Sequence, residues 1–520
     1  MTTREQAIRI SGTSPMTHDS RSADRKAVAK GAGLAFLGRL GALIEPVSVI
    51  LFAKLYGAPT LGLFLLLWGY VQLAAVGADF AMTTALQRFV PSTTDEARIH
   101  QTLKLALAVS ISLSLVLAGT LTWLAPRATA FINADPGASG DLVTIVRLYA
   151  WGIPLWCFIS VSTAAVRARR AFGPEVKVRI FYEQGLRLAA GILFFALGFQ
   201  IYGLFVAHLV AMVVTGYLSL RLLGKHYSLR QMVGAPVDAQ ALGLMFHFGS
   251  PMAVSNLIKR LQSSLPLFVL NLMLPGAAGA AAVAVYAVAR KVVSVLQVIR
   301  QSFEYVMAPL ASASRGQADE SALGNMYAFA TRLICSIFLP AATAVVLVRD
   351  EIVTVIGPEF TAAGTLIAIL VLGRAVEAAT GPSAALVEML GRYRLPLLNG
   401  LLGLGVSALL LIWLTPRLGA PGAAIATAVG INVTALASLL EIWRFYGHQP
   451  YDRRLIRPLA AAAGCSVMIA VVYWLTPGGD AVRFASTAVA LALSLVLLLR
   501  FGFSDGDASA FGKLGRWLRD

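Results

Sequence analysis

Apolar runs of about twenty residues recur along this chain from residue 31 to residue 501, with no long polar stretch between them. An α-helix needs about twenty apolar residues to cross the ~30 Å hydrocarbon core of a membrane, and only helices and closed barrels satisfy their backbone there. The composition agrees, because 58% of the residues are hydrophobic and 13% are charged, whereas soluble domains carry roughly 25% charged residues. We therefore predict an all-α integral membrane protein.

The runs predict about fourteen transmembrane helices. They lie near residues 31–55, 60–84, 103–125, 144–166, 179–199, 202–223, 242–272, 281–307, 326–348, 362–388, 395–414, 421–443, 455–476 and 482–501. The polar, basic segment before the first run is followed by no small-residue cleavage pattern, so we expect an uncleaved anchor. No connection is long enough to house an extramembrane domain.

The distribution of positive charge predicts how the helices are oriented. Lys and Arg stay on the cytoplasmic side during insertion, and about 29 of the 43 lie in the tails and the even-numbered connections. This pattern indicates that both termini are cytoplasmic. It also accounts for most of the net charge of +17, which would otherwise indicate a nucleic-acid partner, so we expect none.

The chain repeats itself weakly at an offset of about 220 residues. Arg39 in FLGRLGALIEP matches Arg260 in LIKRLQSSLP, 221 residues later, and Gly203 matches Gly422 at an offset of 219. The string from Ser162 meets the string from Ser383, again at 221. Such an offset is typical of duplicated transporter halves, and because it equals six spans, both copies enter the membrane in the same direction.

The repeat predicts a division of the chain into two parallel six-helix bundles with two added helices. The expected segments are a cytoplasmic basic tail at 1–29, an N-terminal bundle at 30–226, a C-terminal bundle at 240–447, transmembrane helices thirteen and fourteen at 454–503, and a cytoplasmic tail at 504–520. A substrate site open alternately to each side is then expected at the interface between the bundles.

Several strings carry a resemblance to a known family. Arg39 early in the first run, AKLYGAPTLGLF after it, FGSPMAVSNLIKRL in the seventh run and PRLGAPGAAIATAVG before the twelfth resemble the polysaccharide flippases of the MATE-like MOP superfamily. The resemblance implies a V-shaped pair of bundles that moves undecaprenyl-diphosphate-linked oligosaccharides across the bacterial inner membrane for lipopolysaccharide, capsule or exopolysaccharide assembly. It also implies partners among the polymerase and export machinery.

One string departs from that family pattern. AAVAVYAVA lacks the glycine that such flippases commonly carry just before the position of Tyr286. Helix packing around this tyrosine is therefore expected to differ.

Charged side chains at membrane depth are the candidate functional residues, because each costs at least ~2.5 kcal/mol near the bilayer centre and so faces a cavity or a partner. Two pairs are spaced four apart on one helix, Glu183 with Arg187 and Arg300 with Glu304. That spacing predicts internal ion pairs of structural importance. Arg374 and Glu377 are three apart and lie on a span at the expected interface, so they are both a potential pair and site candidates.

The remaining basic residues predict a cationic cavity. Lys259 and Arg260 are adjacent, as are Arg290 and Lys291, and neighbouring helical residues point about 100° apart, so neither duo can pair internally. Guanidinium groups bind phosphate oxygens in a bidentate, charge-assisted way, which suits a diphosphate head group. The predicted substrate-binding set is Arg39, Lys259, Arg260, Arg290, Lys291, Arg374 and Glu377.

Asp79 is a candidate site for coupling to protons or sodium, although it is a single carboxylate without obvious companion ligands. No phosphate-binding loop, metal-ligand motif or nucleophile–base arrangement occurs in the sequence, so we expect a non-enzyme without cofactor or metal.

Three other functions remain as alternatives. An ion-coupled multidrug exporter of the same superfamily usually has twelve spans and an acidic pocket. A peptidoglycan-precursor flippase shares fourteen spans and a cationic cavity, so the residues alone do not separate it from the favoured function. A membrane O-antigen ligase or polymerase usually needs a large outer loop, which this chain lacks.

Overall fold

The computed structural model describes residues 44–134, 139–169, 171–314, 320–389 and 394–502, and every regular element in these ranges is a helix. Eleven of the described helices are long and apolar enough to cross a membrane. The predicted all-α, multi-pass membrane fold is therefore confirmed. The predicted tails at 1–29 and 504–520 lie outside the described residues.

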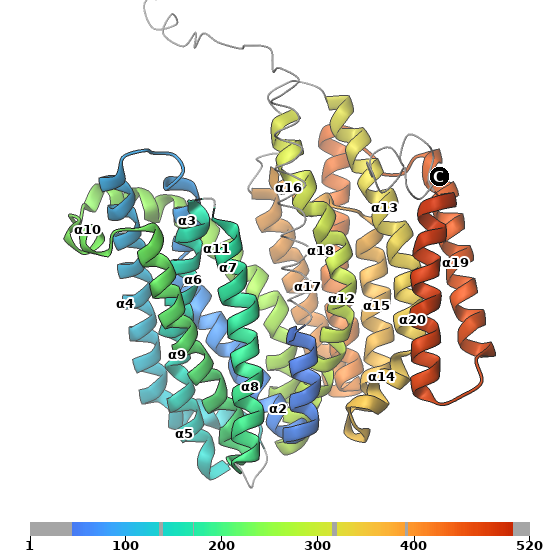
Figure 1. Ribbon diagram of the computed structural model, residues 1–520, viewed down its shortest axis with the longest axis horizontal. Coiled ribbons are helices and arrows are strands. Elements are labelled where there is room, and N and C mark those ends of the chain that lie inside the picture. Colours follow the sequence, from blue (N-terminus) through green and yellow to red (C-terminus); the bar gives the residue numbers. More distant parts are fainter. Residues whose placement is uncertain (1–43, 135–138, 170, 315–319, 390–393, 503–520) are drawn as a thin grey trace, which may run out of the picture.

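The N-terminal bundle occupies one side of the molecule in Figure 1. Its helices are α2 (Ile44–Asp79), α3 (Met82–Phe89), α4 (Glu96–Ala128), α5 (Ser139–Ala150), α6 (Gly152–Ala168), α7 (Phe172–Val176), α8 (Glu183–Ala196) and α9 (Gln200–His226). A π-helical turn, Lys177–Tyr182, joins α7 to α8. The short helix α10 (Leu229–Gly234) follows α9 and precedes the second bundle.

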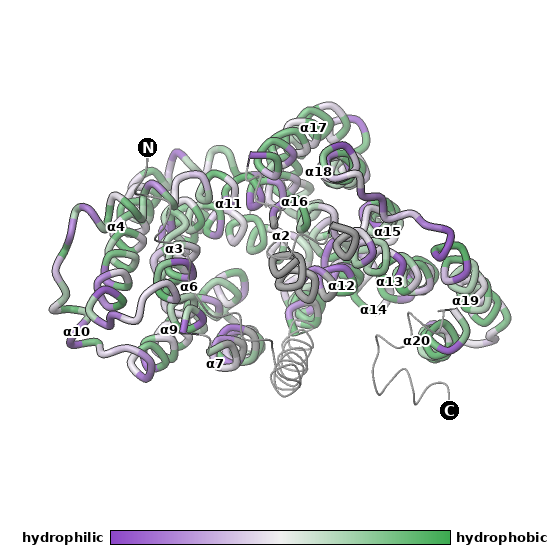
Figure 2. The backbone as a smooth tube through the Cα atoms, turned by 90° about the horizontal axis from the view of Figure 1, so that it is seen from above, coloured by the Kyte–Doolittle hydropathy of each residue, from purple (hydrophilic) through white to green (hydrophobic). Residues whose placement is uncertain are grey.

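The later helices of the C-terminal bundle and the two added helices occupy the other side, whereas its first helix, Ala239–Met273, reaches into the N-terminal side (Figure 1). The helices are α11 (Ala239–Met273), α12 (Gly276–Ser314), α13 (Glu320–Leu347), α14 (Arg349–Ile356), α15 (Ala363–Ala379), α16 (Ser383–Met389), α17 (Arg394–Leu418), α18 (Ala420–Tyr446), α19 (Ile456–Leu475) and α20 (Asp480–Leu497). Figure 2 shows the two sides from above, with α2 and α11 between them and apolar colouring along most helices.

Three of the fourteen expected spans do not appear among the eleven, for identifiable reasons. Residues 31–43 of the first expected span lie outside the described residues, and the rest of it joins the second expected span in α2, which has a break at Gly57, where φ is +76°. The fifth is divided between the π-helical turn and the 14-residue α8. The tenth is divided between α15 and α16 at Gly381, where φ is +62°. Positive φ favours glycine, so both breaks are encoded locally.

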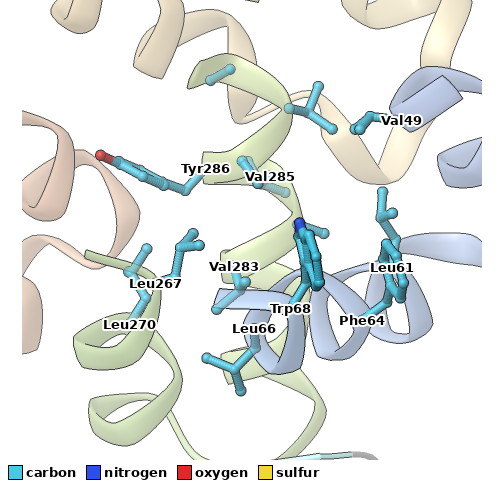
Figure 3. Close-up of a cluster of buried hydrophobic side chains, with 14 of the residues drawn as sticks. Val49, Leu61, Phe64, Leu66, Trp68, Leu267, Leu270, Val283, Val285 and Tyr286 are labelled. Carbon is cyan, nitrogen blue, oxygen red and sulfur yellow. The ribbon is translucent and has the colours of Figure 1, made fainter. Parts of the chain in front are cut away.

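The apolar core continues from one bundle into the other. Phe64, Leu66 and Trp68 of α2 belong to the same buried cluster as Leu267 of α11 and Val283 of α12. Figure 3 shows these side chains converging where the three helices meet. Between membrane helices such contacts stabilise by van der Waals packing rather than by removal from water. The three helices therefore form the joint between the bundles.

Two close approaches seal this joint towards one end of the molecule. A Cβ atom at Gly62 of α2 would lie 1.7 Å from the carbonyl oxygen of Ala280 on α12, so the helices touch backbone to backbone there. Asn133, after α4, donates its side-chain amide to the Asn271 carbonyl (2.7 Å), and Asn271 donates its own to the Asn133 carbonyl (2.7 Å). The Asn133 backbone N–H also donates to Asn271 Oδ1 at 3.0 Å. We call this pair the asparagine clasp.

The clasp lies where α4 and α11 end, at connections that the charge pattern predicts to be outside the cell. Asn271 is only 1% exposed. The bundles are therefore closed against each other at the predicted outer end.

Helices α19 and α20 pack against the C-terminal bundle. Cys465 and Ala462 of α19 share a buried cluster with Leu333 of α13. Two polar contacts reinforce the packing: Arg332 pairs with Asp452 at 2.6 Å, and the Tyr473 hydroxyl donates to Glu351 of α14 at 2.6 Å. The division of the chain into 240–447 and 454–503 remains a prediction.

We expect Tyr473→Phe to destabilise the docking of α19. Glu351 is 5% exposed and its second oxygen, Oε2, has no hydrogen-bond partner, so the variant would leave a buried carboxyl group without its donor. The expected loss is about 1–3 kcal/mol, seen as a lower midpoint of thermal unfolding of the detergent-purified protein. Trp474→Phe is the control, because Trp474 is 76% exposed; equal midpoints for both variants would contradict the prediction.

The repeat has a counterpart in helix lengths. α9 and α18 are both 27 residues long and begin at Gln200 and Ala420, 220 residues apart. This spacing is close to the offset between the matched strings.

Candidate functional site

Helix α11 places the first basic duo between the bundles. Arg260 donates a hydrogen bond to the side chain of Gln72 on α2, across the joint. Lys259 points instead toward α16, where its Nζ lies 3.3 Å from Glu388 Oε1 in a pair that is more than half exposed. Exposed pairs of this kind contribute about 0–1 kcal/mol, so Lys259 remains available to a ligand.

The second duo lies on α12. Arg290 donates to the Ser263 carbonyl of α11 and lies 6.0 Å above the ring centroid of Tyr286. Lys291 pairs with Glu45 of α2 at 2.5 Å. The sequence predicted that neither duo pairs internally, and the acidic partners of Lys259 and Lys291 come from other helices, which sequence spacing does not reveal.

Two adjoining cavities contain most of the predicted residues. The first, of about 430 Å³, lies between α2 and α6 on one side and α11 on the other, and Asp79, Lys259 and Arg260 line it. The second, of about 250 Å³, lies within the C-terminal bundle, and Arg290, Arg374 and Glu377 line it. Lys259 and Ser263 line both, so the two cavities meet at α11. We call them together the central cavity.

A charged cluster forms one wall of the central cavity. Arg374 and Glu377 of α15 pair at 2.5 Å, and Glu377 also pairs with Arg300 of α12 at 2.9 Å. Arg300 in turn pairs with Glu304 at 2.8 Å. Two of the three pairs expected from sequence spacing, Arg300 with Glu304 and Arg374 with Glu377, are therefore present. Glu377 in addition links α12 to α15.

The other expected internal pair is not formed as predicted. Arg187 donates to the Gln184 side chain, and Glu183 Oε2 has no hydrogen-bond partner, although both residues lie on α8. A four-residue spacing permits contact but does not decide which neighbour the side chain chooses. Both side chains are buried.

Arg39, the remaining predicted binding residue, lies outside the described residues. Its role stays a prediction, as do the roles of the other residues in the predicted set. The structure brings six of the seven to the region between and beside α11, α12 and α15, with Lys291 held in its pair with Glu45.

Asp79 occupies the break between α2 and α3. Its carboxylate accepts hydrogen bonds from the Thr83 hydroxyl (2.8 Å) and the Thr83 backbone N–H (3.3 Å). Phe80 and Ala81, which follow it, have φ of +47° and +58°. Among the described residues no group of three or more His, Cys, Asp or Glu could hold a metal ion. Asp79 thus supports the first turn of α3 and also lines the central cavity.

We expect Asp79→Ala to lower stability by about 1 kcal/mol, as for the loss of a helix-capping side chain. Asp79→Asn should keep the wild-type midpoint of thermal unfolding, because the amide oxygen accepts from the Thr83 N–H and the Thr83 hydroxyl accepts from the amide. Equal destabilisation by both variants would contradict the capping role. A folded Asp79→Asn protein that no longer transports would support the predicted ion coupling.

Two arginines that line the central cavity were not among the binding residues predicted from the sequence. Arg167 and Arg179 follow the fourth expected span, where the positive-charge pattern predicts a cytoplasmic connection, yet both line the central cavity. Tyr286 was singled out for a missing glycine, and its hydroxyl donates to Thr427 of α18 at 3.0 Å beside the cavity. The positive-inside pattern identifies a side of the membrane but not whether a charge there faces water or a cavity.

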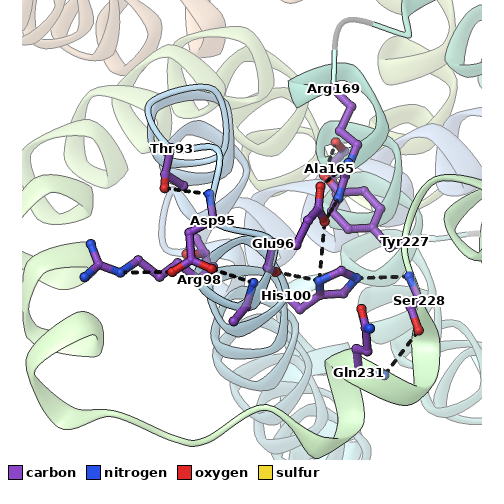
Figure 4. Close-up of polar contacts among 12 residues, drawn as sticks. Thr93, Asp95, Glu96, Arg98, His100, Ala165, Arg169, Tyr227, Ser228 and Gln231 are labelled. Atoms are coloured by element: carbon purple, nitrogen blue, oxygen red, sulfur yellow. Dashed lines mark hydrogen bonds and ion pairs between the residues drawn. The ribbon is translucent and has the colours of Figure 1, made fainter.

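A polar network holds the end of α6 from which Arg167 projects. Arg169 pairs with Glu96 at 2.5 Å and lies 4.4 Å above the ring of Tyr227 (Figure 4). The hydrogen bonds that Arg169 donates to the Glu96 carboxylate raise the pKa of its guanidinium. His100 Nε2 accepts from the Ser228 N–H at 3.0 Å. The network thus ties the ends of α4, α6 and α9 together.

Two bundles that meet at crossing helices and enclose a polar cavity place the chain in the class of membrane proteins with a MATE-like fold. Solved structures agree. The lipid II flippase MurJ in an inward closed conformation has a TM-score of 0.71 at 10% identity, covering 89% of this chain and 97% of that one. An inward-facing multidrug resistance MATE family transporter has a TM-score of 0.60 at 18% identity, covering 78% and 94%. At such low sequence identity, the structural similarity establishes the fold alone.

The family follows from the sequence itself. A model described as polysaccharide biosynthesis protein matches residues 69–362, which is more than half of the 520 residues. The chain belongs to this polysaccharide biosynthesis protein family. The predicted resemblance to the MATE-like polysaccharide flippase family is thereby confirmed at the level of family and fold. No curated protein matches the sequence.

A third structural neighbour shows how variable the cavity is within this fold. It is a MOP superfamily transporter from Pyrococcus furiosus, described as having a binding pocket of reverse polarity, with a TM-score of 0.55 at 18% identity, covering 80% of this chain and 94% of that one. The fold therefore does not identify the transported substrate, which has to be inferred from the charge of the cavity.

Proposed function

We propose that the protein is a flippase that moves an undecaprenyl-diphosphate-linked oligosaccharide across the bacterial inner membrane for surface polysaccharide biosynthesis. The charge of the central cavity carries this proposal. Seven basic residues line it against two acidic ones, Asp79 and Glu377. The basic residues are Arg167, Arg179, Lys259, Arg260, Arg290, Arg300 and Arg374. Such an excess suits an anionic head group.

The same excess argues against a multidrug exporter of cationic compounds, because a cationic drug would be repelled by the cavity. The peptidoglycan precursor is also a lipid-linked diphosphate, and the fold resembles that of the lipid II flippase. We favour a polysaccharide precursor because the family description names polysaccharide biosynthesis.

In the proposed mechanism the diphosphate binds at α11, where both parts of the central cavity meet beside Lys259 and Arg260. Guanidinium groups replace the hydration that the phosphates lose when they leave the headgroup layer. The oligosaccharide occupies the polar cavity, and the polyprenyl chain remains in the lipid. Closure at the asparagine clasp and opening at the other end would alternate as the bundles rock about the joint.

Deletion of the gene tests the proposal. Lipid-linked oligosaccharide should accumulate on the cytoplasmic leaflet, where it resists reagents that modify sugars only outside the cell, and surface polysaccharide should be lost. Expression of the wild-type protein should restore both. A deletion that changed only drug resistance, or that stopped peptidoglycan synthesis, would contradict the proposal.

A further inference from the structure

A third cavity, of about 470 Å³, lies entirely among residues of the N-terminal bundle. Residues of α2, α6, α7, α8 and the π-helical turn line it, and it shares Trp156, Arg167 and Arg179 with the central cavity. Its volume falls within the roughly 300–1,000 Å³ of small-molecule sites. None of its lining residues belongs to the predicted binding set. We call it the side pocket.

The side pocket differs from the central cavity in charge. Three arginines and three glutamates line it. Arg167 and Glu175 neutralise each other at 2.6 Å, and Glu45 is paired with Lys291. The basic and acidic residues of this lining are equal in number, whereas seven basic residues stand against two acidic ones in the lining of the central cavity. The balance indicates a polar but uncharged ligand.

Two side chains that line this pocket carry polar atoms without a hydrogen-bond partner. Glu183, only 2% exposed, has no partner for Oε2, and the Nε of buried Arg187 has none either. A buried polar atom left without a partner costs about 1–3 kcal/mol, which a bound ligand with hydroxyl groups would recover. The hydroxyl both donates to a carboxylate oxygen and accepts from a guanidinium N–H.

Two tryptophans complete the pocket. Trp68 and Trp156 meet edge to face with ring centroids 4.9 Å apart. Arg179 lies 4.8 Å above the ring of Trp156. The negative face of an aromatic ring attracts polarised C–H groups, and a sugar ring combines such C–H groups with hydroxyls. Aromatic rings beside carboxylate and amide groups are therefore suited to a sugar.

We propose that the side pocket binds the sugar residue attached directly to the diphosphate. Gln72 supports the placement, because it lines the side pocket and accepts a hydrogen bond from Arg260 in the central cavity. A head group held at Arg260 brings its first sugar to the entrance of the side pocket. This inference rests on the proposed function and adds a subsite that reads the sugar, separate from the one that holds the phosphates.

Binding of two probes to the protein in lipid nanodiscs tests the subsite. One probe is undecaprenyl diphosphate without sugar, and the other is the lipid-linked oligosaccharide extracted from the deletion strain. Wild-type protein should bind the second about tenfold more tightly. Glu183→Gln should abolish most of this difference and leave the Kd for undecaprenyl diphosphate within about twofold. Trp68→Phe, which keeps an aromatic ring but a smaller one, should reduce the difference partially.

Glu359→Gln is the matched control, because it is the same change at an exposed residue outside both cavities; it should leave both affinities unchanged. Equal weakening of both probes by Glu183→Gln would place Glu183 in the phosphate site or the fold and overturn the inference. Unchanged binding of both would overturn it as well. Wild-type protein that bound neither probe would refute the proposed function, which separates that failure from a failure of the subsite alone.

Discussion

Arg260→Ala is expected to abolish surface polysaccharide export without unfolding the protein. Arg260 hydrogen-bonds to the neutral side chain of Gln72 rather than to a carboxylate, and it lines the cavity where both bundles meet. A hydrogen bond to a charged group contributes about 1.5–3 kcal/mol, which corresponds to roughly 10- to 150-fold in affinity. The measurement is Kd for undecaprenyl diphosphate in nanodiscs, together with restoration of export in the deletion strain.

Two further variants define what Arg260 supplies. Arg260→Lys keeps the charge but loses the planar fork that binds phosphate through two parallel bonds, so its affinity should be intermediate. Arg147→Ala removes the same charge from an exposed position on α5 and should export normally. Full export by Arg260→Ala, or equal loss with Arg147→Ala, would show that the cationic cavity does not bind the head group.

Gly62→Ala is expected to force the two bundles apart. The added Cβ would meet the Ala280 carbonyl oxygen at 1.7 Å and its carbon at 2.6 Å, and backbone atoms cannot rotate out of the way. Overpacking of this kind costs about 1–3 kcal/mol. We expect a lower midpoint of thermal unfolding and reduced export, since closure at this end requires α2 and α12 to touch.

Gly77→Ala provides the control on the same helix. Nothing lies within 4 Å of a Cβ at Gly77, and alanine is favoured over glycine inside a helix by about 0.5–1 kcal/mol. The control should therefore match or exceed the wild-type midpoint. A Gly62→Ala protein as stable and active as Gly77→Ala would mean that the two helices do not approach as closely as described.

The spans could be predicted from sequence because the membrane imposes a length and an apolar composition on each helix. What could not be predicted is how a run is broken. At Gly57 two expected spans meet at a kink within α2, whereas Gly381 divides a single expected span into two short helices. A glycine permits a break, but the packing of neighbouring helices decides how far the chain turns there.

The site could be predicted in outline only. The duo at Lys259 and the duo at Arg290 were found because unpaired charges within a span are costly. The partner of Lys291 is Glu45, which lies on another helix far away in the sequence, so no spacing rule reveals it. The side pocket was missed for the same reason. Trp68 and Glu183 are far apart in the sequence and line one pocket only because α2 and α8 come together in the fold.

The asparagine clasp bears on the energetics of a transport cycle. Its members carry no charge, so neither salt nor acidity at the predicted outer end should loosen it. Three hydrogen bonds at about 0.5–1.5 kcal/mol each would keep the outward-open conformer a minor population, roughly 0.1–10% of the molecules. A cargo inverts that ratio only by binding the open conformer more tightly than the closed one. Turnover could thus be adjusted through Asn133 and Asn271 while every residue that recognises the cargo stays unchanged.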